Sequence, residues 1–136
     1  MKDISILKPV MAQALLTFAV LFWMAKERLV AFRAGTVVSN GPGTRPTWPG
    51  RAGTVSNAYH NLLEIPMLFF AVCAFALIAD AADGKMVVLA WVYVAFRTAQ
   101  ACIHTTYNKI PHRFAAFVVS NFVLIAMWVN LALHIL

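Results

Sequence analysis

The chain has few charged residues, and acidic ones are the scarcest. Of 136 residues 12% are charged, with five Asp or Glu against eleven Lys or Arg. Ordinary globular domains carry charge on about a quarter of their residues, so this class is excluded. The sequence also lacks CxxC, HExxH and carboxylate clusters, and its one glycine-rich stretch lacks the Lys-Ser/Thr ending of a phosphate loop. We therefore expect no metal site.

The remaining composition is strongly apolar, with 62% hydrophobic residues. Four segments are at or near the ~20 residues needed to cross a bilayer core. They are centred on residues 9–25, 62–79, 85–107 and 113–136. The first is expected to be a retained anchor, because Trp23 and Lys26 stand where a signal peptide would need small residues before its cleavage site. The sequence thus predicts an all-α integral membrane protein, with one four-helix domain over residues 1–136.

Basic residues are distributed unequally between the two sides of this bundle. Seven fall beside the first and third connections: Lys26, Arg28, Arg33, Arg45, Arg51, Lys109 and Arg113. The other side has only Lys2, Lys8 and Lys85, together with three aspartates. By the positive-inside rule, the Gly- and Pro-rich loop 33–53 and the turn 108–113 should be cytoplasmic and both termini on the opposite side. Topology thus explains the net charge of +6, and no nucleic-acid partner is expected.

Two stripes of polar residues approach the membrane from the cytoplasmic side. Asn57, His60, Asn61 and Glu64 follow at i, i+3, i+4 and i+7, which places them on one helical face. The 85–107 segment repeats the pattern with Arg97, Gln100, His104 and Tyr107. A charged residue at a helix centre costs about 2.5–3.5 kcal/mol even on lenient insertion scales. We therefore expect Glu64 and Arg97 to pair.

Each of these residues also has a simpler explanation. Polar residues near a membrane boundary are often interfacial, and a buried Arg–Glu pair can serve only to fix helix register. Two facing stripes that end on the same side, joined there by Arg113 and a basic loop, favour a site. Its ligand would be anionic and would enter between helices from the cytoplasm.

Two motifs resemble the family of membrane-associated proteins in eicosanoid and glutathione metabolism, the MAPEG family. "NAYHNLLEIPMLFF" (57–70) is similar to the second-helix motif, A-x-x-N-x-x-E followed by Pro and Phe. "FRTAQACIHTTYNKIPHRFAAF" (96–117) is similar to the third helix and the turn after it. The resemblance extends over essentially the whole chain. It implies a homotrimer of four-helix subunits that holds glutathione between neighbouring subunits near the cytoplasmic face.

The resemblance also implies roles for individual residues. Arg113 matches the arginine that stabilises the thiolate in catalytic members, since a nearby cation lowers a thiol's pKa and yields the nucleophile at neutral pH. The implied glutathione contacts are Lys26 or Arg28, His60, Asn61, Glu64, Arg97, His104 and Tyr107. The second, lipophilic substrate could arrive from the bilayer.

Two interpretations of the function stay open. In the first, the protein is a glutathione-dependent transferase or peroxidase acting on lipophilic electrophiles or lipid hydroperoxides. In the second, it is a non-catalytic trimeric membrane scaffold or lipid-binding protein. The second is kept because this chain has Gly53-Thr54 where active members have Glu-Arg, His60 where they have an arginine, and Phe114 where some have serine.

Overall fold

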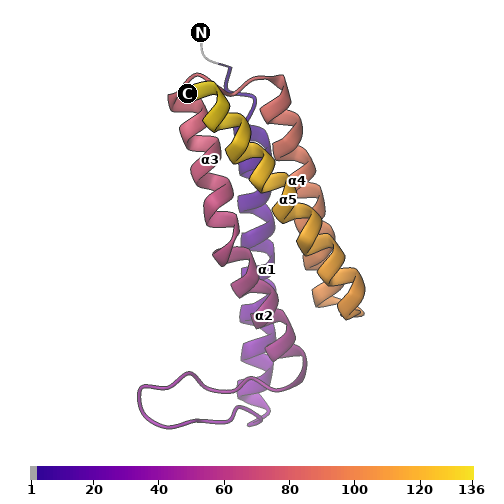
Figure 1. Cartoon of the computed structure of the whole chain (residues 1–136). Helices are drawn as coiled ribbons and strands as arrows, with labels where there is room; N and C mark the ends of the chain where they lie inside the picture. Colours follow the sequence, from indigo (N-terminus) through magenta and orange to yellow (C-terminus); the bar gives the residue numbers. More distant parts are fainter. Residues whose placement is uncertain (1–2) are drawn as a thin grey trace.

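The protein is an elongated bundle of helices (Figure 1). The computed structural model describes residues 3–136, so Lys2, counted above on the side of the termini, lies outside the described residues. The helices are α1 (Leu7–Arg33), α2 (Gly50–Glu64), α3 (Pro66–Ile78), α4 (Gly84–Thr105) and α5 (Ile110–Ile135). Because α2 and α3 form one span, Gly50–Ile78, four spans are long and apolar enough to cross a membrane. This confirms the predicted all-α, multi-pass membrane architecture.

The first connection is shorter than the sequence suggested. We expected a loop over 33–53, whereas α1 continues to Arg33 and α2 begins at Gly50, which leaves residues 34–49 as the loop. Helix α1 ends there because Gly35 takes a left-handed conformation (φ 68°), and the amide of Thr36 bonds back to the Ala31 carbonyl. The polar stripe that starts at Asn57 therefore lies wholly on a helix.

The second span is broken at Ile65. Pro66 has no amide hydrogen to donate to the carbonyl one turn earlier, so it ends α2 and occupies the first turn of α3. The break separates a half that carries the polar stripe from an apolar half, "PMLFFAVCAFALI".

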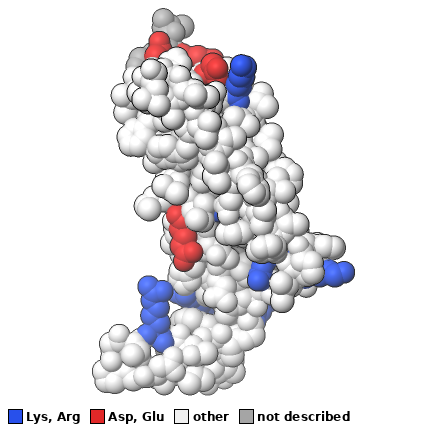
Figure 2. Space-filling view, viewed as in Figure 1, with Lys and Arg blue, Asp and Glu red and all other residues white. Residues whose placement is uncertain are grey.

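Both termini and the α3–α4 turn lie at one end of the bundle, which we call the termini end. The loop 34–49 lies at the other, the loop end, where α4 and α5 lean away from α1 and α2 (Figure 1). Lys and Arg side chains gather towards the loop end, whereas acidic residues predominate at the termini end (Figure 2).

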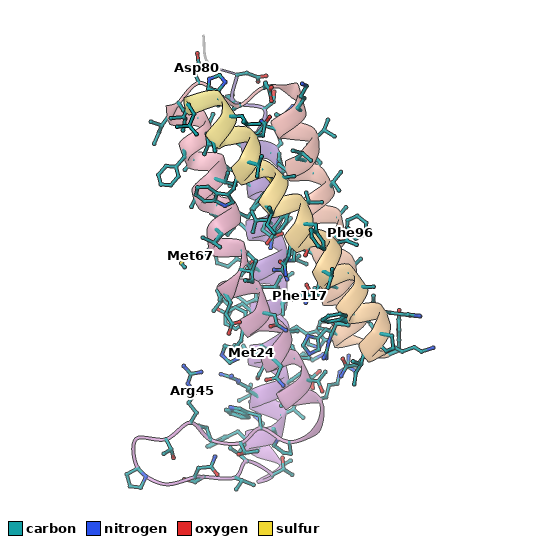
Figure 3. All side chains as sticks on the ribbon, viewed as in Figure 1. Met24, Arg45, Met67, Asp80, Phe96 and Phe117 are labelled. Carbon is teal, nitrogen blue, oxygen red and sulfur yellow. The ribbon has the colours of Figure 1, made fainter. Side chains whose placement is uncertain are left out.

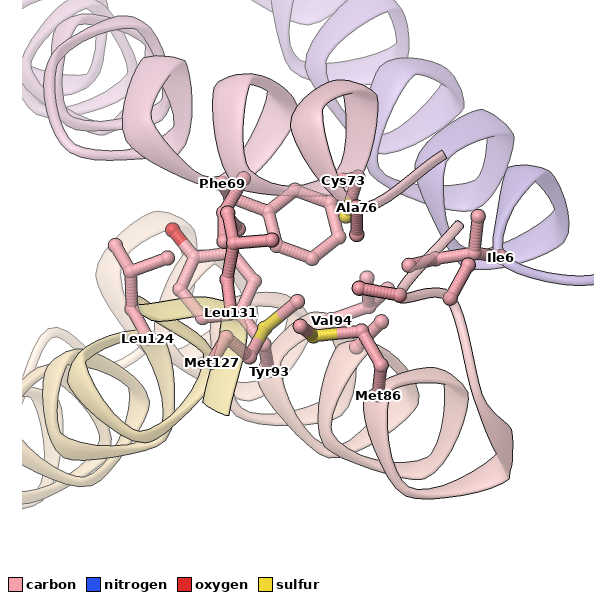
Figure 4. Packing of buried hydrophobic residues seen from close by; sticks show 14 residues of the cluster. Ile6, Phe69, Cys73, Ala76, Met86, Tyr93, Val94, Leu124, Met127 and Leu131 are labelled. Carbon is pink, nitrogen blue, oxygen red and sulfur yellow. The ribbon is translucent and has the colours of Figure 1, made fainter. Parts of the chain in front are cut away.

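The apolar interior consists of two clusters. The termini-end cluster joins the start of α1 to α3, α4 and α5 around Phe69 and Tyr93, whose rings stack at a centroid distance of 4.5 Å (Figure 4). The α1–α2 cluster lies nearer the loop end and contains Val20, Met24, Val55, Ala58 and Leu62. No buried apolar cluster occupies the loop-end half of α4 and α5, where several polar residues are buried instead.

Candidate functional site

An open cavity of about 450 Å³ lies at the loop end, between α2 and the α4–α5 pair. Its lining residues are all polar: Arg45, Asn57, His60, Asn61, Glu64, His104 and Arg113. They come from the loop, from α2, from α4 and from the first turns of α5. The structure thus brings together five of the site residues predicted from the sequence, and we call this space the polar cavity.

Packing of the opposite face of α2 turns the polar stripe towards the cavity. Val55, Ala58 and Leu62 are buried against Val20 and Met24 of α1. With that face fixed on α1, the residues of the stripe lie at the surface or partly exposed, and Glu64 is exposed. The periodicity read from the sequence therefore gives the correct orientation of the helix.

The other wall is held by the turn between α4 and α5. His104 is buried in the last turn of α4. Arg113 donates from Nη1 to Oδ1 of Asn108 at 2.7 Å, and Asn108 takes a left-handed conformation (φ 48°) that reverses the chain. This bond uses one guanidinium donor and leaves the others able to reach a ligand in the cavity.

The lining charges favour an anionic ligand. Arg45 and Arg113 are cationic, two imidazoles accompany them, and Glu64 is the acidic residue among the lining side chains. The Arg45 side chain extends from the loop in the direction of the helices (Figure 3) and makes no hydrogen bond or ion pair within residues 3–136. Its charge is therefore available to a bound molecule.

Arg97 does not pair with Glu64, so that prediction is wrong. Its side chain is fully buried and donates from Nε to the Tyr93 hydroxyl at 3.0 Å and from Nη1 to Oε1 of Gln100. These acceptors lie at i−4 and i+3 on its own helix, within easy reach, and the ring of Phe117 on α5 covers the guanidinium at 5.3 Å. Glu64 instead faces the polar cavity.

Three other predicted contacts lie outside the polar cavity of a single chain. Lys26 is exposed on α1. Arg28 lines a neighbouring cavity and donates from Nε to the Ser56 hydroxyl at 3.0 Å. Tyr107 is exposed, and its hydroxyl lies 3.3 Å from Nδ1 of His112.

Two lining residues, Asn57 of the polar stripe and Arg45 of the basic loop, were not among the implied glutathione contacts. Asn57 belongs to the same stripe as Glu64, seven residues earlier, so its spacing was a sufficient signal. Arg45 lies in the irregular loop, where no periodicity indicates direction, and its place in the wall depends on how that loop folds back. Within the loop, the Asn40 amide donates to the Arg45 carbonyl and to the Thr47 hydroxyl, both at 2.9 Å.

Comparison with known proteins agrees with this architecture. The model of the MAPEG family matches residues 6–133, which is nearly the whole chain. No curated protein and no solved structure matches the chain closely enough to be counted as similar. The match covers the first three spans, the fourth except for its last two residues, the loop 34–49 and every residue that lines the polar cavity. The chain therefore belongs to the MAPEG family.

Proposed function

We propose that the protein is a glutathione-dependent transferase or peroxidase that acts on lipophilic electrophiles or lipid hydroperoxides. The observation that carries this proposal is the convergence of α2, α4, α5 and the loop on one polar cavity with a cationic excess. Its volume of about 450 Å³ falls within the range of roughly 300–1,000 Å³ typical of small-molecule sites. A tripeptide with two carboxylates matches both its size and its charge.

The lining side chains match the groups of glutathione. Arg45 and His60 can bind the carboxylates, and the amides of Asn57 and Asn61 can hydrogen-bond the peptide units. Glu64 can accept from the ligand's ammonium group. Under this assignment Glu64 binds the ligand rather than a basic residue of its own chain.

Arg113 is assigned to the thiol. A guanidinium beside the sulfur favours the thiolate over the thiol, which raises the nucleophile concentration at neutral pH. With an electrophile, the thiolate forms the new carbon–sulfur bond either by displacing a leaving group, which departs with the bonding electron pair, or by adding to an activated double bond, after which the adjacent carbon takes up a proton. With a hydroperoxide, the sulfur attacks the peroxide oxygen, the O–O bond breaks to release the alcohol, and a second glutathione resolves the product to the disulfide and water.

The site is proposed to be completed by assembly into a homotrimer, as the family resemblance implies. In a lone chain, the exposed Asn57 and Glu64 belong to a membrane span, where contact with lipid would be costly. A neighbouring subunit would cover them and could bring its own Lys26 or Tyr107 to the cavity. The positive-inside rule favours a cytoplasmic position for this end, and the cytoplasm supplies glutathione.

A non-catalytic trimeric scaffold or lipid-binding protein is the second candidate. The observation that favours it is the state of Arg28, the basic contact expected from α1. Its guanidinium is held by Ser56 and lies 4.9 Å from the ring centre of Trp48, beside a different cavity. Less cationic charge then remains for glutathione than in catalytic relatives.

Ultraviolet absorbance of the bound thiolate distinguishes the two candidates. Purified protein is titrated with glutathione, and S-methylglutathione, which has no ionisable thiol, serves as the matched control ligand. An enzyme of the proposed type gives a saturable thiolate band with glutathione alone. Binding without such a band, combined with no turnover of any electrophile or hydroperoxide tested, would support the scaffold.

A further inference from the structure

A second open cavity, of about 590 Å³, lies at the loop end between α1, α2 and the loop 34–49. The residues that matter in its wall are Arg28, Arg45, Thr47, Trp48, Ser56 and His60. No Asp or Glu is among its described lining residues. We call this space the basic cavity; it carries two guanidinium groups without an acidic neighbour in its wall.

Arg28 is held in place while most of its donors remain unused. Its Nε bonds to the Ser56 hydroxyl and its guanidinium carbon lies over Trp48, but its two Nη atoms have no hydrogen-bond acceptor within residues 3–136. The adjacent acid, Glu27, is engaged elsewhere: Oε1 accepts from Trp23 at 3.0 Å and from Arg51 at 3.3 Å. The wall therefore presents guanidinium N–H donors that are held in position. The adjacent carboxylate, Glu27, is bound to other residues and does not neutralise them.

Gly53 allows the loop to form this wall. A Cβ atom at this position would collide with the backbone carbonyl oxygen of Trp48. The loop therefore packs directly on α2 only because the residue is glycine, and this contact carries Trp48 to the Arg28 guanidinium. The Gly53 that departs from the catalytic family pattern thus has a structural role in the basic cavity.

The basic cavity lies at the level of lipid headgroups. Arg28 is roughly 30 Å along α1 from Leu7, at about 1.5 Å per residue, which equals the thickness of a bilayer's hydrocarbon core. Trp48 lines it, Trp23 precedes Arg28 by five residues on α1, and tryptophan is enriched at this boundary. An anionic group that reaches the cavity at this level is therefore expected to be the phosphate of a lipid.

A separate apolar groove lies between the same two spans, nearer the termini end. Its volume is about 310 Å³, and it is lined by Ala14, Thr17 and Phe18 of α1 and by Leu62, Leu63, Met67 and Phe70 of α2 and α3. Positions 14, 17 and 28 of α1 share one helical face, since they are separated by three and eleven residues. The distance from Arg28 to Phe18 is about 15 Å along the helix, which is half the thickness of the hydrocarbon core.

We propose that this seam between α1 and α2 binds one anionic phospholipid whose headgroup carries hydroxyls, of the phosphatidylglycerol class. The phosphate lies between Arg28 and Arg45, the headgroup hydroxyls bond to Thr47 and Ser56, and one acyl chain occupies the apolar groove. A choline or ethanolamine headgroup is disfavoured, because its cation would meet two arginines and no carboxylate. The proposal does not rest on glutathione binding, although Arg45, Asn57 and His60 border both cavities.

Competition between lipids tests this site. The purified protein is reconstituted in nanodiscs of equimolar phosphatidylglycerol and phosphatidylcholine, then released into mild detergent, and the retained lipid is identified by native mass spectrometry. Wild type is expected to retain phosphatidylglycerol selectively. Arg28→Gln should lower retention by about tenfold, since a charge-assisted hydrogen bond to phosphate is roughly twice as strong as a neutral one. Arg33→Gln, an exposed basic residue of the same helix outside both cavities, is the matched control.

Further measurements keep the result interpretable. Arg45→Gln, in the exposed loop, replaces Arg28→Gln if the latter fails to fold. Inorganic phosphate alone separates a free anion from a lipid: if it protects against thermal unfolding as well as phosphatidylglycerol does, the lipid assignment is wrong. Equal retention of both lipids, or equal loss in Arg33→Gln and Arg28→Gln, also overturns the proposal.

Discussion

Arg97 donates a hydrogen bond from Nε to the Tyr93 hydroxyl, 3.0 Å away and one turn earlier on α4. The Tyr93 ring stacks in turn on Phe69 of α3. A buried charge at mid-span is thus connected directly to the packing between two spans. This connection stabilises the arrangement of α3 and α4 that supports the cavities at the loop end.

Tyr93→Phe should destabilise the protein. The substitution keeps the stacked ring but leaves Nε of Arg97 without its acceptor in a buried site. We expect the free energy of unfolding to fall by about 1.5–3 kcal/mol, the range for hydrogen bonds to charged groups. Denaturation in detergent, followed by tryptophan fluorescence, measures the change. Tyr59→Phe is the control, because the half-buried Tyr59 makes no hydroxyl hydrogen bond within residues 3–136; equal losses in both variants would contradict this role.

Replacement of two buried glutamines by leucine should change the free energy of unfolding in opposite directions. Gln13 on α1 is fully buried, and neither of its amide atoms has a partner within residues 3–136. Gln100 accepts from Arg97. Gln13→Leu should raise the free energy of unfolding by ~1–3 kcal/mol, the usual penalty of an unpaired buried group, whereas Gln100→Leu should lower it. Destabilisation by Gln13→Leu would instead indicate a bound internal water.

A double-mutant cycle tests the absence of a Glu64–Arg97 pair. Wild type, Glu64→Gln, Arg97→Met and the double variant are compared by the same denaturation assay. Because the two side chains do not share a partner, their effects should add to within ~0.5 kcal/mol. A coupling of several kcal/mol, as expected for a buried ion pair, would restore the pairing predicted from the sequence.

Arg113→Ala should lower the activity without changing the oligomeric state. Water can replace the contacts of this residue at the open cavity, so native mass spectrometry should find the oligomer of the wild type unchanged. The bound thiol's pKa should rise and kcat should fall, with a smaller effect on glutathione affinity, because the cation acts on the developing thiolate. Lys109→Ala, on the same turn but outside the cavity, is the control. Full activity in Arg113→Ala would exclude its proposed role.

Sidedness can be measured by cysteine labelling. In a variant without Cys73 and Cys102, single cysteines are placed at Ser39 in the loop and at Lys85 on the termini end, both exposed. The excess of basic residues at the loop end predicts that a membrane-impermeant maleimide added outside intact cells labels only the Lys85→Cys protein. Labelling of Ser39→Cys from outside would reverse the orientation.

The spans and the polar face of α2 could be predicted because each depends on local regularity. Length and apolar content identify the spans, and the 3.6-residue period brings His60 and Glu64 to one side. The break at Pro66 follows from the chemistry of one residue, although we did not predict it. These features need no knowledge of the tertiary contacts.

The partners of Arg97 and the folding of the loop could not be predicted in the same way. Glu64 has the complementary charge, but Tyr93 and Gln100 lie closer on the same helix, and charge alone does not reveal this competition. The position of Arg45 depends on long-range contacts of the loop, such as that between Trp48 and Arg28. Sequence therefore indicated which helices meet at the cavity better than which side chains pair there.

The break at Ile65 divides the second span between the two apolar clusters. Phe69 and the rest of α3 belong to the termini-end cluster, whereas Val55 and Leu62 of α2 pack on α1. Substitutions on the polar side of the 15-residue α2 therefore leave the contacts that fix the membrane anchor untouched. Natural selection can alter the ligand chemistry of such a protein gradually, through changes in one short helix and its loop, while the other spans keep the chain correctly inserted.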